Sequence, residues 1–262
     1  MSEERIGRTL AVAAIVAVFC SLVVSSAVIY LRPIHLAWAA LDQNRNVLQV
    51  AGLLPAAEET TDRQVVTLFR ELDVRLVNLA SGLFDQQLDA LAYDQQSAAD
   101  EPATSVIIPA GLDLARLGRR ARLATVYLVW NGGRIQHIVL PLRGQGMWAP
   151  IEGHIALEAD FNTVTGIGFH QHGETPGIGD RIQQRDWQAS WIGKKIYGPD
   201  GQIRIGFAAI HSTGLQPEHR FDAISGATVT VTAVNQMVAY WLGQHGFGPF
   251  LDQLRNNRDK QE

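Results

Sequence analysis

The strongest pattern in the chain is an uninterrupted apolar run close to its start. Thr9 to Leu31 holds 23 residues without a charge, mostly Ala, Val, Leu and Ile. At about 1.5 Å per residue a helix of this length spans about 34 Å, enough to cross a hydrocarbon core of about 30 Å. The alternative is a cleaved signal peptide, but its apolar region usually has only about 7–15 residues. Arg32-Pro33 also follows in place of a small-residue cleavage site, so the pattern predicts an uncleaved single-pass anchor in a lipid bilayer.

The charges that flank this run favour a cytoplasmic N-terminus. Arg5 and Arg8 precede the run, and Arg32 alone follows it closely. Positive residues are enriched in the cytoplasmic flank of a membrane helix, so an excess of one predicts that the long remainder lies outside the cytoplasm.

Helical periodicity continues after the anchor. Residues 34–52 predict a juxtamembrane helix, and Thr61 with Gln64 forms the pattern of a capping box. Apolar residues then recur at helical spacing and predict an amphipathic helix: Val65, Leu68, Phe69, Leu72 and Leu76. Residues 93–104 are polar and predict a linker or exposed loop.

The middle of the chain changes to the pattern of strands. Runs rich in β-branched residues at 125–130 and 134–142 flank Asn131-Gly132-Gly133, whose residues tolerate positive φ, so they predict a hairpin. A second hairpin is predicted within 155–172, and shorter strands at 195–197 and 203–211.

The last patterned segment, Val229 to Leu242, fits two structures. Its first residues alternate as in a strand, but Val231, Val234, Val238 and Trp241 share one helical face, and Gly243 could end a helix. Both interpretations stay open from the sequence.

These elements predict an α+β fold: a single N-terminal transmembrane helix followed by a mixed α+β domain. The expected organisation is an N-terminal segment at 1–33 with the transmembrane helix at about 9–31, a juxtamembrane and helical region at 34–115, the main α+β domain at 116–255, and a polar tail at 256–262.

Composition narrows the functions that this fold can carry. With 47% apolar and 18% charged residues the chain is that of a folded protein, and a net charge of −4 gives no footprint for nucleic acid. The single cysteine, Cys20, excludes an internal disulfide and a cysteine-ligated iron–sulfur cluster within the chain. His170 and His172 alternate without a third ligand, so we expect no metal site. A basic cluster is expected to form a solvated face or to contact anionic lipid or a partner: Arg116, Arg119, Arg120 and Arg122.

Two glycine-containing stretches remain as candidate ligand sites. Glu174 to Gly179 reads Glu-Thr-Pro-Gly-Ile-Gly, a rigid loop whose glycines let backbone approach a ligand; the alternative is a tight turn into a helix at 181–191. Asp222 to Thr228 reads Asp-Ala-Ile-Ser-Gly-Ala-Thr before the final patterned segment. If that segment is a helix, its first amides form a phosphate seat, and the alternative is a Ser or Thr N-cap.

The second stretch, Asp222-x-x-Ser225-Gly226-Ala227-Thr228, resembles the flavinylation motif of the FMN-binding domain family. In that family a flavin transferase takes FMN from FAD and attaches it through a phosphoester to the last Thr. Three further stretches are similar to the family of C subunits of Na⁺-translocating NADH:quinone oxidoreductases: RNVLQVAGLL at 45–54, GQGMWAPIEG at 144–153 and DFNTVTGIGFHQHGETPGIG at 160–179. The likeness runs from the anchor to about Phe247. The G subunits of Rnf electron-transport complexes share the anchor and the motif, but the first two stretches fit C subunits better.

The resemblance implies a role for each candidate residue. Thr228 would bear the phosphoester to FMN, Ser225 to Ala227 would shape the phosphate seat and the turn that the transferase recognises, and Asp222 would present that turn. The loop from Glu174 to Gly179 would line the isoalloxazine ring, with Thr175 and Ile178 as ring contacts. The chain departs mildly from the family, because Ile178 stands where Leu is usual and the helix start is less rich in Ser and Asn.

The implied function is electron relay without an acid or base catalyst. The chain would work inside a six-subunit complex of the bacterial inner membrane, with A, B, D, E and F subunits, that oxidises NADH, reduces ubiquinone and exports Na⁺; residues 116–255 would form the FMN-binding domain on the periplasmic side. Two alternatives stay open: an Rnf-type subunit with covalent FMN, and a membrane-anchored phosphate-binding module without redox chemistry.

Overall fold

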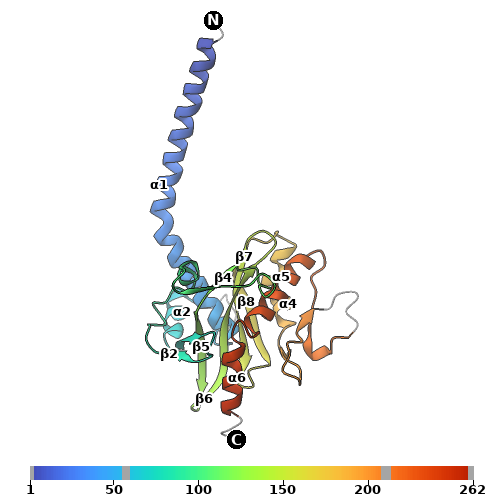
Figure 1. The fold of residues 1–262 in the computed structure, drawn as a ribbon. Helices are drawn as coiled ribbons and strands as arrows, with labels where there is room; N and C mark the ends of the chain where they lie inside the picture. Colours follow the sequence, from blue (N-terminus) through green and yellow to red (C-terminus); the bar gives the residue numbers. More distant parts are fainter. Residues whose placement is uncertain (1–2, 55–59, 208–213, 259–262) are drawn as a thin grey trace. The chain divides into compact units, whose positions relative to one another are not determined.

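The computed structural model describes residues 3–54, 60–207 and 214–258 (Figure 1). The chain divides into two compact units, Met1–Asp42 and Gln43–Glu262. The first unit is helical as far as it is described, and the second holds the strands and the remaining helices.

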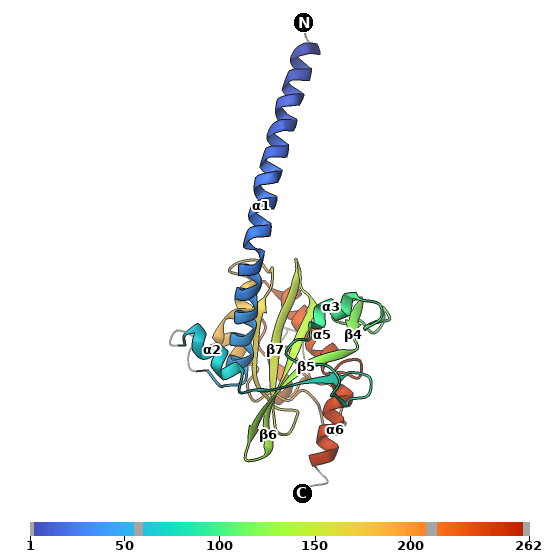
Figure 2. The same cartoon turned by 90° about the vertical axis from the view of Figure 1, so that its left-hand side faces the viewer.

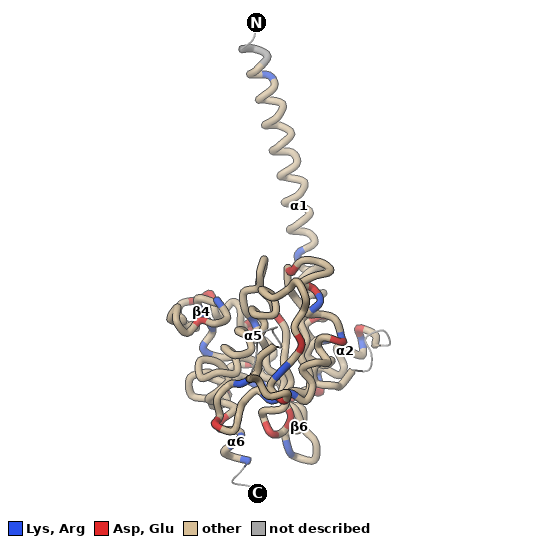
Figure 3. The backbone as a smooth tube through the Cα atoms, turned by 90° about the vertical axis from the view of Figure 1, so that its right-hand side faces the viewer, with Lys and Arg blue, Asp and Glu red and all other residues tan. Residues whose placement is uncertain are grey.

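The N-terminal helix, α1 (Glu3–Val50), is longer than the predicted anchor. It continues through Pro33, so the predicted anchor and juxtamembrane helix form one helix whose last turns belong to the second unit. Ile6–Val50 is the one candidate membrane span in the described residues, by length and composition, and its most apolar window is unburied. Figure 3 shows no charged residue along the middle of α1, and the sequence has none between Arg8 and Arg32. These properties fit a membrane-anchored protein.

A six-stranded antiparallel sheet forms the centre of the second unit. Its strand order is β2 (Phe84–Asp85), β1 (Asp73–Asn78), β5 (Leu123–Asn131), β6 (Arg134–Gln145), β7 (Pro150–Glu158) and β8 (Val164–Gln171). Two small sheets accompany it: β3 (Ser105–Ile107) with β4 (Arg119–Ala121), antiparallel, and β9 (Gly206–Phe207) with β10 (Arg220–Phe221), parallel.

The helices of the second unit are mostly short. Among the described residues, and after the end of α1, they are α2 (Asp62–Phe69), α3 (Gln95–Asp100), the 3₁₀ helix η2 (Gly179–Gln183), α4 (Arg185–Ala189), the 3₁₀ helix η3 (Pro217–His219), α5 (Thr228–Trp241) and α6 (Gly248–Arg258).

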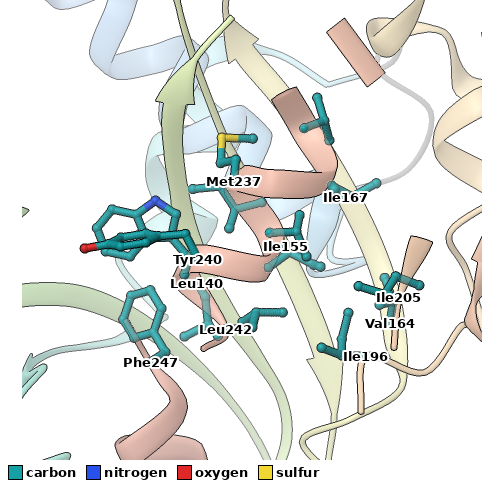
Figure 4. Packing of buried hydrophobic residues seen from close by; sticks show 14 of the residues in the cluster. Leu140, Ile155, Val164, Ile167, Ile196, Ile205, Met237, Tyr240, Leu242 and Phe247 are labelled. Carbon is teal, nitrogen blue, oxygen red and sulfur yellow. The ribbon is translucent and has the colours of Figure 1, made fainter. Parts of the chain in front are cut away.

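Side chains alternate along each strand, so the sheet has two faces. Both faces are buried, each by its own hydrophobic cluster. On one face, Leu128 and Ile155 join the main core with α5 and the start of α6. Figure 4 shows this cluster, in which Leu140 of β6 and Ile155 of β7 lie with Met237 and Tyr240 of α5. On the other face, Tyr127 and its neighbours pack against the end of α1, through residues such as Val47 and Val50. Figure 2 shows the end of α1 and helix α5 on opposite sides of the strands.

Local sequence signals are confirmed where hydrogen bonding is local. The capping box of α2 forms, with the Gln64 amide donating to Thr61 Oγ1 and the Thr61 amide donating to Gln64 Oε1. The β5–β6 hairpin turns at Gly132 and Gly133, which have φ of 57° and 79°. β7 and β8 pair as the second predicted hairpin.

Other segments differ from the sequence-based expectation. The predicted linker at 93–104 contains α3, and the predicted helix at 181–191 is divided into η2 and α4. Of the predicted strands, 195–197 forms only isolated bridges and 203–211 is reduced to β9, with 208–211 outside the described residues. The ambiguous last segment is helical, because that conformation puts Val231, Val234, Val238 and Trp241 into the core. β1 pairs with β5, so the sheet begins well before the expected domain boundary at 116.

Candidate functional site

The fold brings the two candidate stretches together at the start of α5. The loop from Glu174 to Gly179 follows β8, and the stretch from Asp222 to Thr228 leads into α5. The Glu174 carboxylate accepts a hydrogen bond from the Thr230 hydroxyl, across a sequence separation of 56 residues. The Ile178 Cγ2 atom lies 3.9 Å from the position that a Cβ on Gly226 would take. One site therefore includes both stretches.

Helix α5 begins without a side-chain cap. Thr228 is its first residue and is exposed, and the N-cap is Ala227, so the predicted alternative of a Ser or Thr N-cap is wrong. The first helical bond runs from the Val231 amide to the Ala227 carbonyl at 3.0 Å. The amides that precede Val231 in the first turn lack helical acceptors, as they do at every helix start. Such amides, with the helix dipole, suit a phosphate group.

The turn before α5 is anchored by its buried residues and leaves the others exposed. Ile224 and Ala227 are buried, whereas Ser225, Gly226 and Thr228 are exposed. The Ala227 amide donates to the Ile224 carbonyl at 3.1 Å, and Gly226 has a φ of 81° that favours glycine. The exposed residues are therefore presented together.

Helix α4 holds the first residue of the motif by its backbone. The Trp187 Nε1 group donates to the Asp222 carbonyl at 2.8 Å, and the Asp222 amide donates to Ser190 Oγ at 3.2 Å. Trp187 is itself buried in an aromatic group with Trp191 and Phe221. Asp222 is exposed, so its backbone is fixed while the residue stays accessible.

An exposed apolar surface lies beside the candidate loop. Trp148 is 67% exposed, and its Nε1 group donates to Thr175 Oγ1 at 3.1 Å. Met147 and Ile178 are also exposed. Thr175 and Ile178 are predicted from the sequence, whereas Trp148 enters there only as part of the stretch at 144–153. The signal that could have identified Trp148 is its place in the turn between two predicted strands, next to Met147. Exposed apolar residues that cluster in this way mark a site for a ligand or partner.

Two of the predicted loop residues are buried. Glu174 is 5% exposed, and its Oε1 atom accepts from the Met147 amide at 2.8 Å. Gly179 is buried too, and a Cβ there would lie 2.8 Å from Thr230 Oγ1. Both residues form the base of the loop. Thr230 is not among the predicted residues, because nothing local in the sequence relates it to Glu174.

The two histidines considered as metal ligands, His170 and His172, make different contacts. His170 stacks on His154 with ring centroids 5.4 Å apart, and His154 Nδ1 lies 2.7 Å from Asn46 Oδ1 of α1. Burial lowers the pKa of His154 well below its usual value. His172 follows β8, and its Nδ1 atom accepts from the Glu174 amide at 3.2 Å.

One of the four arginines predicted to form a solvated basic face, Arg120, is buried instead. Arg120 is only 9% exposed and donates to the Ala121 carbonyl at 3.0 Å, and Arg119 donates to Ser105 Oγ at 2.6 Å. These arginines support the β3–β4 segment, where backbone and hydroxyl oxygens satisfy their charge-bearing groups.

Comparison with known proteins defines the class. Residues 146–243 match the FMN-binding domain family, and this range contains both candidate stretches and all of α5. The chain is thus a protein with an FMN-binding domain and an N-terminal apolar helix.

Full-length relatives define the family more closely. The C subunit of the Na⁺-translocating NADH-quinone reductase of Pseudomonas aeruginosa is 37% identical over 257 residues, with 97% of this chain and 98% of the relative covered. That of Vibrio vulnificus is 38% identical over 260 residues, with the same coverage. The crystal structure of Shewanella oneidensis NqrC is similar with a TM-score of 0.71 and 32% identity, covering 81% of this chain and 96% of that one. The chain belongs to the family of Na⁺-translocating NADH-quinone reductase C subunits.

Proposed function

We propose that this chain carries FMN on Thr228 through a phosphoester and relays electrons as the C subunit of a Na⁺-translocating NADH-quinone reductase. One observation carries the proposal: Thr228 is the exposed first residue of a helix without a side-chain cap, and the turn that precedes it lies beside the exposed Ile178. Membership in a family of subunits with an FMN-binding domain supports it.

The attachment step fits the residues at the helix start. With FAD supplied by a flavin transferase, the Thr228 oxygen would attack the phosphorus on the riboflavin side of the pyrophosphate. An oxygen–phosphorus bond would form, the pyrophosphate bond would break with AMP as the leaving group, and the hydroxyl proton would pass to a base on the transferase. The amides of the first turn of α5 and the turn from Ser225 to Ala227 would then hold the phosphate charge. The exposed Asp222 would present this turn to the transferase.

The neighbouring loops would hold the ring. Thr175 and Ile178 are exposed beside the helix start and would contact the isoalloxazine, with Glu174 and Gly179 as the buried base of the loop. FMN supplies one- and two-electron redox chemistry when bound, and the chain supplies position and electrostatics. No acid or base at the site is needed for this role.

The remaining parts of the proposal concern location and partners. The N-terminal helix would anchor the chain in a bacterial inner membrane, with the second unit on the periplasmic side. A covalent link would keep the flavin on a domain that the cytoplasmic flavin pool does not reach. Subunits of the A, B, D, E and F types would complete the complex. A reporter that is active only outside the cytoplasm is expected to be active when fused after Glu262, and a silent reporter would contradict the topology.

The direct test is flavinylation of the full chain in cells that also express a flavin transferase. We expect in-gel flavin fluorescence that survives denaturation in the natural chain and is absent from Thr228→Val, which is nearly isosteric. Thr232→Val, a substitution of the half-buried threonine one turn further along α5, is the matched control and should keep the fluorescence. Fluorescence that persists in Thr228→Val would refute the attachment residue.

A further inference from the structure

A single buried carboxylate joins the three segments that surround the start of α5. Glu174 belongs to the loop after β8, its Oε1 atom accepts from the Met147 amide in the β6–β7 turn, and its Oε2 atom accepts from Thr230 in α5. The side chain is 5% exposed, so both oxygens are directed to protein donors. The carboxylate is thus a structural link between these segments.

Two glycines make room for this link. A Cβ on Gly179 would lie 2.8 Å from Thr230 Oγ1 and 2.9 Å from Glu174 Cβ, both closer than ordinary contact. A Cβ on Gly146 would overlap the Glu174 Oε1 atom. The chain therefore has no side chain at the two positions where one would displace the carboxylate.

The position of the carboxylate also complements the helix. Thr230 is the third residue of α5, which has no acidic residue of its own in its first turn. A negative charge beside the first turn stabilises a helix through its dipole, and hydrogen bonds to a charged acceptor are stronger than neutral ones. Glu174 can therefore replace an acidic first-turn residue without occupying the amides at the helix start.

We propose that Glu174 is a positioning residue for flavin attachment. By holding Thr230, it fixes the start of α5 against the loops that carry Trp148 and Ile178, and so fixes where the Thr228 hydroxyl is presented. Glu174 does not touch the transferred group and acts through Thr230. The consequence for attachment rests on the proposed function, whereas the link itself does not.

The link is tested by amide hydrogen exchange on the full chain in detergent, without flavin. Thr230→Val removes the donor at nearly constant volume, and Glu174→Gln removes the charge and one acceptor. We expect Thr230→Val to raise exchange about tenfold in residues 231–233, the first amides of α5 with helical acceptors, with 235–241 unchanged. Because the two side chains act together, the double variant should exchange no faster than the faster single variant. Thr230→Ser should restore protection, and Thr232→Val should leave it unchanged.

The consequence for attachment is tested by flavinylation kinetics with a purified transferase and FAD. We expect Thr230→Val and Glu174→Gln to raise the KM for the chain about tenfold while kcat changes less than twofold, because the hydroxyl of Thr228 is intact but less well presented. Thr230→Ser should return the KM to that of the natural chain.

The possible outcomes separate the two proposals. Unchanged exchange in Thr230→Val, additive effects in the double variant, or faster exchange throughout α5 would each overturn the positioning role. Faster exchange in the first turn with unchanged KM would overturn its consequence for attachment. If the natural chain accepts no flavin at all, the proposed function fails, and the exchange measurement still decides whether the link exists.

Discussion

Replacing Gly179 by Ala tests how closely the candidate loop must approach α5. The added Cβ would lie 2.8 Å from Thr230 Oγ1, 2.9 Å from Glu174 Cβ and 3.0 Å from Glu174 Oε2. Carbon atoms in ordinary contact lie about 3.5–4.0 Å apart, so the loop or the helix start must move by more than about 0.5 Å. Both neighbours are buried, so no flexible chain end can absorb this shift.

The magnitude follows from two effects. Inserting a methyl group into a packed region typically costs about 1–3 kcal/mol. If the Thr230–Glu174 bond is also lost, a buried acceptor without its donor adds about 1–3 kcal/mol. A central value of about 3 kcal/mol corresponds to a fall in Tm of about 6–12 °C for a unit of this size.

The assay is thermal unfolding of the full chain in detergent, followed by near-UV circular dichroism. Gly111→Ala is the matched control, because a Cβ at that exposed glycine would meet nothing within 4 Å. It is expected to change Tm by less than about 2 °C, since surface substitutions are usually worth less than about 0.5 kcal/mol. A Tm for Gly179→Ala equal to that of the control would refute the close approach of loop and helix.

Three further predictions concern other parts of the fold. Burial lowers the pKa of His154 below 6.5 in the folded chain. As the pH falls, the imidazole of the unfolded chain is therefore protonated at a higher pH than that of the folded chain. The free energy of unfolding therefore has its full value above about pH 6.5 and falls by about 1.4 kcal/mol per pH unit as the pH drops towards the folded pKa of His154. Denaturant titrations should show this slope in the natural chain and a smaller slope in His154→Phe. Thr61→Ala removes the cap of α2 and should lower the free energy of unfolding by about 1 kcal/mol. Denaturant titration curves that coincide with those of the natural chain would contradict a stabilising role of the cap. Ser190→Ala removes the acceptor of the Asp222 amide and should slow flavinylation several-fold with little change in Tm; an unchanged rate would contradict the role of α4 in holding the motif.

The elements that could be predicted from sequence are those fixed by neighbouring residues. The capping box at Thr61 and Gln64 and the turn at Gly132-Gly133 satisfy their own hydrogen bonds within a few residues. The start of α3 was missed although its signal is local, because Asp94 caps it by accepting from the Gln96 and Ser97 amides within a stretch that is otherwise polar.

The site was predicted in its parts but not in its assembly. The motif ending in Thr228 and the loop from Glu174 were found from composition and resemblance. Their contact through Thr230 spans 56 residues and depends on how α5 packs on the sheet, which no local pattern encodes. The same limit applies to α5 itself, since alternation at Val229 to Val231 fits a strand until burial in the core decides for a helix.

The most direct measurement of the central claim is peptide mass spectrometry on the full chain purified from cells that express a flavin transferase. Trypsin releases Phe221 to Arg255 as one peptide, which contains Thr228 and every other residue of α5. This peptide is expected to be heavier by FMN minus one water, with fragment ions that place the addition on Thr228. An unmodified peptide from a chain that fluoresces, or an addition on Thr230 or Thr232, would contradict it.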